Sequence, residues 1–312
     1  MADEPTSAAD AALVVVHSAM STTGPLRDRN EDHLGWGRVG DTDSGIVVGS
    51  LTAMRPVGLI GAAEGAVDVW GPVSGTNAEV AGSGMVFVVA DGLGGHGGGD
   101  VASHLAIGQL LERFGDVKES GSGGASLLRA GFNAANQRVF DAAVAGEGAR
   151  RMQTTLTALV ILSGEAHIGH VGDSRIYRSR GDMLELLTTD HTQVMEMIRM
   201  RLIRADQAAD HPARHALTRS LGADITVRTD VRMEPLADGD TFLVCSDGLW
   251  SKVDAGEIRE ALREDPKVAC ERLVVMAIAR GGEDNATAVV VRVERAGMVS
   301  DRPRGWRRFL PS

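Results

Sequence analysis

Met85-Val86-Phe87-Val88-Val89-Ala90-Asp91-Gly92 is the stretch that decides the fold, because six apolar residues predict a buried strand and an acidic turn follows directly. The same pattern recurs in Thr241-Phe242-Leu243-Val244-Cys245-Ser246-Asp247-Gly248. Asp284-Asn285 stands just before a third apolar run at 287–293. Carboxylates at strand ends can converge at one edge of a sheet sandwich, and Mg²⁺ and Mn²⁺ prefer clustered carboxylate and carbonyl oxygens. The three stretches therefore predict a divalent-metal site.

Each of these stretches also has a simpler interpretation. Asp-Gly is a common turn pair, so Asp91-Gly92 alone favours a polar turn. The glycine-rich run at 94–99 changes that estimate, since glycine lets the backbone approach a ligand and exposes carbonyl oxygens. A phosphate-cradling loop is the rival interpretation, but the Gly-Lys-Ser/Thr of a Walker A motif does not follow. One chain with two stretches that each place Asp-Gly directly after an apolar strand is much harder to explain by two turns that have no function.

The segment Arg27-Asp28-Arg29-Asn30-Glu31-Asp32 adds positive charge beside further carboxylates. A solvated loop is the plain interpretation. A guanidinium, however, binds phosphate oxygens in a two-pronged fashion. Two adjacent cations activate water and hold phosphoryl oxygens, so the segments together predict metal-dependent hydrolysis of phosphate esters. Asn285 is expected to orient the carboxylates by hydrogen bonding.

The bulk composition limits the classes of protein that fit. The chain has 312 residues, of which 43% are hydrophobic and 4% aromatic, enough for an aliphatic core in one large or two small domains. The net charge of -10 argues against a nucleic-acid or membrane-surface binder. No apolar stretch approaches the roughly 20 residues that span a bilayer, and no secretory signal is visible. Cys245 and Cys270 belong to no Cys-x-x-Cys pair, which predicts buried thiols in a reducing cytoplasm.

Periodicity predicts many strands and two pairs of helices. Strands are expected at 13–18, 85–90, 155–162, 165–171, 174–179, 183–187, 227–233, 241–245 and 286–293, and long helices at 101–114, 125–144, 255–263 and 268–280. Shorter helical stretches are expected at 192–202, 205–209 and 215–221. Strands and helices do not alternate strictly, so two sheets with helices packed outside are favoured over a doubly wound parallel sheet.

Three segments stand apart from this pattern. Residues 1–12 are expected to be a disordered N-terminus, because they are polar and lack periodicity. Residues 40–84 are rich in glycine and read as a long insertion with a short hairpin near 46–51. Residues 295–312 form a basic tail, for which a solvated state is favoured over a docking element.

Eight segments, in order along the chain, resemble those of the metal-dependent protein phosphatases of the PP2C type (the PPM family), in the form of the bacterial branch. They are Arg27-Asp28-Arg29-Asn30-Glu31-Asp32, Val89-Ala90-Asp91-Gly92-Leu93-Gly94-Gly95-His96, Thr154-Thr155-Leu156-Thr157, Gly169-His170-Val171-Gly172-Asp173-Ser174-Arg175, Thr188-Thr189-Asp190-His191-Thr192, Leu217-Thr218-Arg219-Ser220-Leu221-Gly222, Ser246-Asp247-Gly248-Leu249-Trp250 and Asp284-Asn285-Ala286-Thr287. The resemblance covers residues 13–294. It implies an α+β fold, a four-layer α-β-β-α sandwich of two antiparallel sheets flanked by helix pairs, with a small flap subdomain at 190–222.

The resemblance also implies two Mn²⁺ or Mg²⁺ ions, with a weaker third ion as in bacterial relatives. By motif position, the residues that hold them are Asp91, the Gly92 carbonyl, Asp247 and Asp284, with Glu31 and Asp32 acting through bound waters and Asp173 serving the third ion with Asp247. Arg27 matches the arginine that holds the substrate phosphate, whereas Arg29 has no counterpart.

The activity implied is that of a serine/threonine protein phosphatase, in which a water bridging two ions attacks phosphorus. The leaving oxygen needs a proton, and His96 is the nearest candidate general acid. A structural role for this glycine-flanked histidine stays equally open, because many eukaryotic relatives carry the acid at the position of Leu93. The expected partners are phosphorylated proteins and an opposing bacterial Ser/Thr kinase, and the expected state is a monomer.

Two alternatives remain from the sequence. The first is a catalytically weak member that serves as a regulatory or binding module. Inactive members are expected to lose metal-binding aspartates, and this chain keeps Asp91, Asp247 and Asp284. The second is a hydrolase of small phosphate esters, since the metal centre is indifferent to the leaving group.

Overall fold

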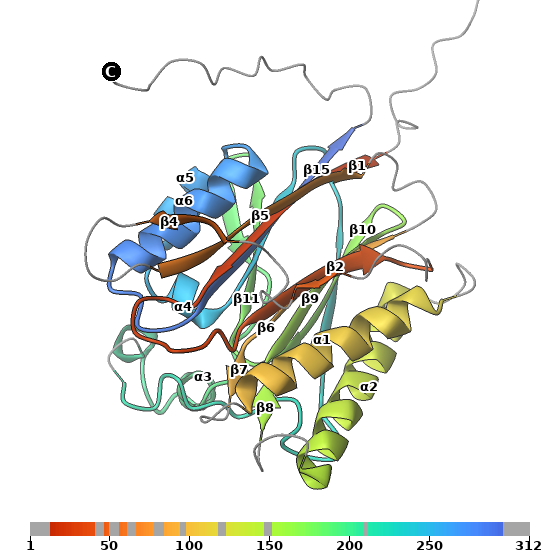
Figure 1. The fold of residues 1–312 in the computed structure, drawn as a ribbon, viewed down its shortest axis with the longest axis vertical. Coiled ribbons are helices and arrows are strands. Elements are labelled where there is room, and N and C mark those ends of the chain that lie inside the picture. The colour runs from red at the N-terminus through yellow and green to blue at the C-terminus, as the bar shows by residue number, and fades with distance from the viewer. Residues whose placement is uncertain are drawn as a thin grey trace, which may run out of the picture.

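Two antiparallel sheets stacked face to face form the centre of the molecule, and a pair of helices covers the outer face of each sheet (Figure 1). The computed structural model describes residues 13–40, 47–49, 56–60, 67–77, 84–93, 98–117, 123–146, 152–208 and 211–295. Within these residues the layers run helix, sheet, sheet, helix, so the predicted α+β sandwich is confirmed.

One sheet contains seven strands and the other six. The first has the order β12 (Met183–Leu186), β11 (Arg175–Arg180), β14 (Thr241–Cys245), β15 (Ala286–Arg295), β1 (Leu13–Thr22), β5 (Val67–Asn77) and β4 (Pro56–Ile60). The second has the order β13 (Asp230–Pro235), β10 (Glu165–Val171), β9 (Leu156–Leu162), β6 (Met85–Ala90), β2 (His33–Arg38) and β3 (Val47–Gly49). A small ribbon of β7 (Gly92–Leu93) and β8 (Gln153–Thr154) lies beyond the end of β6.

The helices lie on the outer faces. The pair α1 (Gly99–Gly115) and α2 (Gly124–Ala145) covers the six-stranded sheet, and α5 (Ala255–Ala261) and α6 (Pro266–Ala279) cover the seven-stranded sheet. Three short elements, α3 (Gln193–Arg199), the 3₁₀ turn η2 (Ala205–Gln207) and α4 (Asp247–Trp250), lie toward one end of the sandwich. None of the helices within the described residues is long and apolar enough to cross a bilayer.

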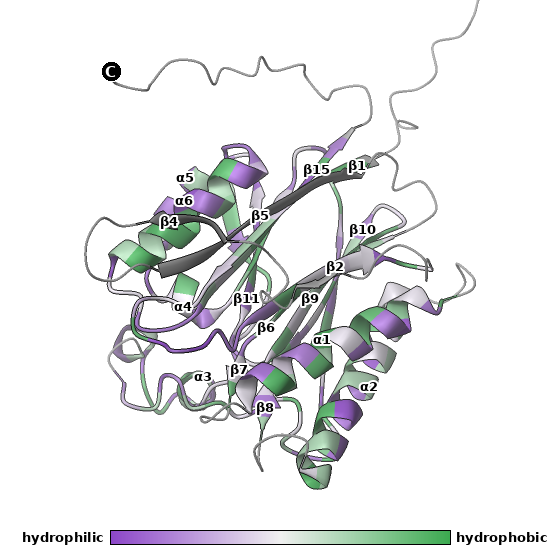
Figure 2. Cartoon of the chain, in the orientation of Figure 1, coloured by the Kyte–Doolittle hydropathy of each residue, from purple (hydrophilic) through white to green (hydrophobic). Residues whose placement is uncertain are grey.

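The apolar side chains divide into three clusters, one between the sheets and one beneath each helix pair. Phe87 and Leu159 lie in the central cluster, whereas Val86 and Val88 face α1 and α2. The strand β6 is therefore buried on both faces, which explains its unbroken apolar run. Figure 2 shows that the long helices carry both hydrophilic and hydrophobic residues, as expected of elements with one face on the core.

Strand pairing brings the acidic segments to one edge. In the ladder between β2 and β6, His33 pairs with Ala90, so Asp32 and Asp91 are the next residues beyond that pair. In the ladder between β14 and β15, Cys245 pairs with Ala288. Asp247 therefore lies near Asp284, and both sheets end in carboxylates on the same side.

Several element predictions were wrong. The strand β2 was missed, because Gly35 and Gly37 interrupt its apolar pattern. Residues 215–221 form no helix. Their backbone is irregular, and isolated β-bridges join Leu217 to Thr192 and Leu221 to Thr154. The helix expected at 192–202 ends at Arg199, and Arg201 adopts a positive φ of 59°.

The segment 40–84 contains more structure than the predicted hairpin near 46–51. Its described residues form three strands: β3 pairs with β2, and β5 pairs with β1 and β4. Both sheets are thus extended by this segment. Its remaining residues, the N-terminal residues 1–12 and the tail beyond 295 lie outside the described residues, as does His96.

Candidate metal centre

A cavity of about 680 Å³ opens at the acidic edge of the sandwich. Most of the predicted site residues line it, namely Arg27, Glu31, Asp91, Gly92, Asp173, Asp247 and Asp284. They come from the loop after β1, the end of β6, the turn after β10, the start of α4 and the turn before β15. The structure thus brings together segments that lie more than 250 residues apart in the chain.

Asp91 is surrounded by other carboxylates. Burial raises its pKa well above the ordinary value, and the negative charges of Asp32, Asp247 and Asp173 raise it further. The Asp91 amide donates to Thr155 Oγ1 at 2.9 Å, which holds the turn in place. Buried carboxylates this close destabilise one another unless cations or protons lie between them.

Asp32 lies beneath the cavity rather than on its wall, with only 1% of its surface exposed. Its Oδ2 accepts hydrogen bonds from Ser246 Oγ at 2.6 Å and Thr287 Oγ1 at 2.7 Å. Its Oδ1 has no partner among the described residues. Burial and the charges of nearby carboxylates raise the pKa of Asp32 despite these bonds.

A second group of possible ligands lies at the other side of the cavity. Ligand atoms of Asp173, His215 and Asp247 all lie within 4.8 Å of one another. Burial and the charge of Asp247 raise the pKa of Asp173 to about 8. The Oδ1 of Asp247 is buried without a partner in the described part of the chain. This donor set suits a divalent cation, which would compensate the buried charge.

The segment 190–222, predicted to be a flap, contributes two residues that sequence reasoning missed, Arg214 and His215. His215 Nδ1 lies 3.4 Å from Asp247 Oδ2, and Arg214 Nε donates to His215 Nε2 at 2.8 Å. Because Nε2 accepts this bond, the proton of a neutral His215 resides on Nδ1 and faces the carboxylate. No sequence signal identified these residues, since neither belongs to one of the eight segments that resemble the family.

Arg27 lies at the mouth of the cavity with about half of its side chain exposed. Its Nη2 contacts Asp284 Oδ2 at 2.7 Å, and its Nε donates to the Glu283 carbonyl at 3.2 Å. Arg29 points elsewhere, 3.9 Å from Asp100. The structure therefore separates the two arginines of this segment, with Arg27 alone lining the cavity.

Asn285 holds the loop that carries Glu31. Its Oδ1 accepts from the Glu31 amide at 2.7 Å, and its Nδ2 donates to the carbonyls of Thr23 and Arg29 at 2.8 and 3.0 Å. These three bonds go to backbone atoms and not to carboxylates. Asn285 thus positions the acidic loop through its side chain, and its backbone amide donates to Asp284 Oδ1 at 2.9 Å.

Close backbone packing explains the glycine of the second Asp-Gly pair. A Cβ atom on Gly248 would collide with the carbonyl oxygen of Asn285. Glycine at this position lets α4 start directly against the turn that carries Asp284. The two carboxylates of Asp247 and Asp284 are thereby brought to the same wall of the cavity.

Asp173 and the base of the flap share one network. Trp250 Nε1 donates to the Asp173 carbonyl at 2.9 Å, and the Arg175 guanidinium lies 3.4 Å from the centre of the Trp250 ring. Arg175 also makes two bonds to Asp190, at 2.9 and 2.7 Å. The start of the flap is thus tied to the turn that presents Asp173.

Comparison with known proteins agrees with this geometry. Residues 75–275 match the family model described as Protein phosphatase 2C. The serine/threonine phosphatase stp of Listeria monocytogenes is 33% identical over 210 residues, covering 66% of this chain and 83% of that protein. Protein phosphatase PhpP of Streptococcus pneumoniae is 33% identical over 216 residues, covering 66% and 85%.

A solved structure extends the similarity over most of the chain. The catalytic domain of serine/threonine protein phosphatase PstP, in complex with two manganese ions, superposes with a TM-score of 0.68 at 28% identity, covering 90% of this chain and 99% of that chain. The chain belongs to the protein phosphatase 2C family. The prediction of a PP2C-type serine/threonine phosphatase of the bacterial branch is confirmed.

Proposed function

We propose that this chain hydrolyses phosphoserine and phosphothreonine in proteins, using Mn²⁺ or Mg²⁺ held at the acidic edge of the sandwich. The observation that carries the proposal is the convergence of Asp91, Asp173, Asp247 and Asp284 with Arg27 on one cavity. The expected substrates are phosphorylated proteins of a bacterial Ser/Thr kinase pathway in the cytoplasm. The two unpaired, buried cysteines fit a reducing compartment.

The carboxylates divide the cavity into two metal-binding regions. The principal ions would be held by Asp91, Asp247, Asp284 and the Gly92 carbonyl. A further ion would be held by Asp173, His215 and the other side of Asp247. When bound, such ions supply an activated water and neutralise the phosphoryl oxygens. Glu31 and Asp32 would orient the waters of the site through their carboxylates.

Arg27 is proposed to bind the phosphate group of the substrate. Its guanidinium lies at the cavity mouth, and the contact with Asp284 keeps it beside the carboxylate that would hold metal. An entering phosphate offers two oxygens to the same fork of N–H donors. His96 remains the proposed proton donor to the leaving oxygen, on sequence grounds alone.

The test is phosphopeptide hydrolysis by the wild type and by Asp247→Asn, after EDTA treatment and after Mn²⁺ or Mg²⁺ addition. Asp224→Asn, an exposed aspartate away from the cavity, is the matched control. Turnover that needs metal and is lost only in Asp247→Asn supports the proposal. Hydrolysis of p-nitrophenyl phosphate but of no phosphopeptide would favour a small-ester hydrolase. Failure on both substrates with metal bound would favour a regulatory module.

A further inference from the structure

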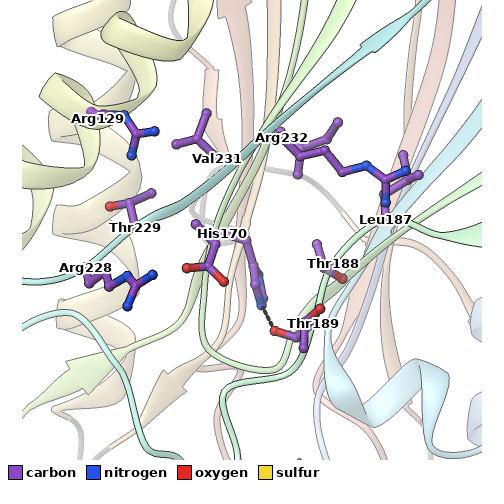
Figure 3. A pocket seen from close by; sticks show the side chains of 11 residues that line it. Arg129, His170, Leu187, Thr188, Thr189, Arg228, Thr229, Val231 and Arg232 are labelled. Atoms are coloured by element: carbon purple, nitrogen blue, oxygen red, sulfur yellow. Dashed lines mark hydrogen bonds between the residues drawn. The ribbon is translucent and has the colours of Figure 1, made fainter. Parts of the chain in front are cut away.

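A second cavity, of about 480 Å³, shares no lining residue with the cavity at the carboxylate cluster (Figure 3). It opens where β13, the edge strand of the six-stranded sheet, meets the chain that follows β12. Its lining includes three arginines and three threonines, namely Arg129, Arg228, Arg232, Thr188, Thr189 and Thr229. In a protein of net charge -10, a cavity lined by more arginines than carboxylates has a locally positive potential.

Two of the three arginines have charges that no carboxylate neutralises. Arg232 is paired, with Nη2 at 2.7 Å from Glu185 and Nε at 2.6 Å from Glu234. Arg129, on α2, and Arg228, just before β13, are exposed and pair with no acidic side chain in the part of the chain that the structure describes. These two residues therefore supply free N–H donors and an unbalanced positive charge.

Asp230, the acidic side chain that lines the cavity, is paired with residues other than Arg129 and Arg228. Asp230 accepts from Arg219 at 2.9 Å and lies 3.1 Å from His191 Nε2, so both of its oxygens are used. His170 also lines the cavity, and burial lowers its pKa to about 3, so it adds no charge at neutral pH. Its Nε2 lies 3.2 Å from the Thr189 carbonyl.

Thr229 gives a second, independent sign of a missing partner. It lies between Arg228 and Asp230 in sequence, and Figure 3 draws it between Arg129 and Arg228. Its side chain is 8% exposed, and its hydroxyl has no hydrogen-bond partner among the described residues. A buried hydroxyl without a partner is unfavourable, and an anion oxygen held by the two arginines would supply the acceptor.

We propose that this edge cavity is an anion subsite that binds a phosphate group through Arg129, Arg228 and Thr229. Guanidinium forks match the oxygens of a tetrahedral phosphate, and a threonine hydroxyl adds a neutral donor. The phosphate has two possible sources, free inorganic phosphate or a second phosphorylated side chain on a protein substrate. Both present the same doubly charged group to the same donors.

The direct test is calorimetric titration of inorganic phosphate into the Mg²⁺-loaded full chain. Two sites are expected in the wild type, one at the metal centre and one at the edge cavity. Arg129→Ala/Arg228→Ala is expected to weaken the second site at least tenfold, because each charge-assisted bond contributes about 1.5–3 kcal/mol, which corresponds to roughly tenfold or more in affinity. Arg27→Ala is expected to weaken only the site at the metal centre.

The matched control is Arg113→Ala/Arg259→Ala, which removes the same two charges from exposed positions on α1 and α5, outside the cavity. If the control variant keeps both phosphate sites, the loss of the second site in Arg129→Ala/Arg228→Ala is due to the cavity itself and not to the lower overall charge. A single phosphate site in the wild type, abolished by Arg27→Ala, would overturn the proposal. Equal loss in the control and cavity variants would overturn it as well, by showing a general charge effect.

Peptide kinetics identify the source of the phosphate. A KM that rises in Arg129→Ala/Arg228→Ala for doubly, but not for singly, phosphorylated peptides assigns the subsite to substrate. If the variant leaves the ratio of KM for doubly and singly phosphorylated peptides unchanged, and calorimetry shows the second phosphate site in the wild type, the subsite is assigned to free phosphate. The calorimetric result does not depend on turnover, so failure of the proposed enzyme activity and failure of this subsite are distinguishable.

Discussion

Replacing Asp173 by asparagine is expected to stabilise the metal-free protein and to weaken its stabilisation by metal. The Asp173 side chain is 4% exposed, and burial with the charge of Asp247 raises its pKa to about 8. An aspartate in the unfolded chain titrates near 4. Between these two pH values the folded state binds one more proton than the unfolded state. The metal-free wild type therefore loses stability as the pH rises from about 4 to about 8.

The size of the effect follows from the same pKa. Each pH unit between the unfolded pKa and pH 7 corresponds to about 1.4 kcal/mol, so the upper estimate for Asp173 is about 4 kcal/mol. Water entry and relaxation of the cavity reduce this value. We expect Asp173→Asn to raise the free energy of unfolding of the metal-free protein by roughly 1–3 kcal/mol at pH 7, because an amide needs no proton to be neutral.

Urea unfolding at pH 5 and pH 7.5, with EDTA or with Mn²⁺, measures both halves of this prediction. Without metal, the excess unfolding free energy of Asp173→Asn over the wild type is expected to shrink at pH 5. The stabilisation by Mn²⁺ is expected to be smaller in the variant than in the wild type. Asp224→Asn, which is exposed, is expected to change neither quantity. An Asp173→Asn protein that is less stable than the wild type without metal at pH 7.5 would refute the reasoning.

Three further predictions concern single residues. Arg27→Ala is expected to lower kcat/KM on phosphopeptides roughly 10- to 100-fold with little change in metal affinity, measured by steady-state kinetics against metal titration. His17 is buried without a partner among the described residues, and burial lowers its pKa to about 4. Since an unfolded histidine titrates near 6.5, His17 alone is expected to contribute a loss of about 2 kcal/mol between pH 7 and pH 5, so the change in unfolding free energy over this range is expected to differ by that amount between His17→Leu and the wild type in urea unfolding. Asn285→Ala leaves the Glu31 amide and two carbonyls without the Asn285 side chain as a partner. We therefore expect the free energy of unfolding to fall by about 2–4 kcal/mol in the same assay. Asn285→Asp tests whether the N–H donors of the Asn285 side chain are needed.

The buried strands and their terminal aspartates were predictable because the information is local. Six consecutive apolar residues before Asp91 specify a strand buried on both faces, and the acidic turn necessarily lies at its end. Antiparallel pairing then places Asp91, Asp247 and Asp284 at one edge, as expected. Where glycine or proline breaks the apolar pattern, as in β2, β4 and β5, pairing with neighbouring strands decides the structure, and a single sequence does not contain that signal.

The flap residues were unpredictable for a different reason. Residues 211–221 form irregular backbone, which is held by tertiary bonds such as the one from the Thr218 amide to the His191 carbonyl. His215 reaches Asp247 only because that irregular path crosses the cavity. The helical prediction for 215–221 relied on apolar spacing alone, and long-range contacts override such spacing in short segments.

The position of His215 links the segment 190–222 to the charge of Asp247 in the carboxylate cluster. One oxygen of Asp247 faces His215, while the other is buried without a partner in the described residues. Asp247 thus offers one oxygen to the flap and one to a cation. The hydrogen bond with Asp247 raises the pKa of His215, and the negative carboxylate holds the Nδ1–H of His215 toward the cavity. A cation held jointly by Asp173, Asp247 and His215 would replace this hydrogen bond with shared ligation and would keep His215 at the site. Loading of the site and the position of the flap are therefore expected to be coupled through this one aspartate.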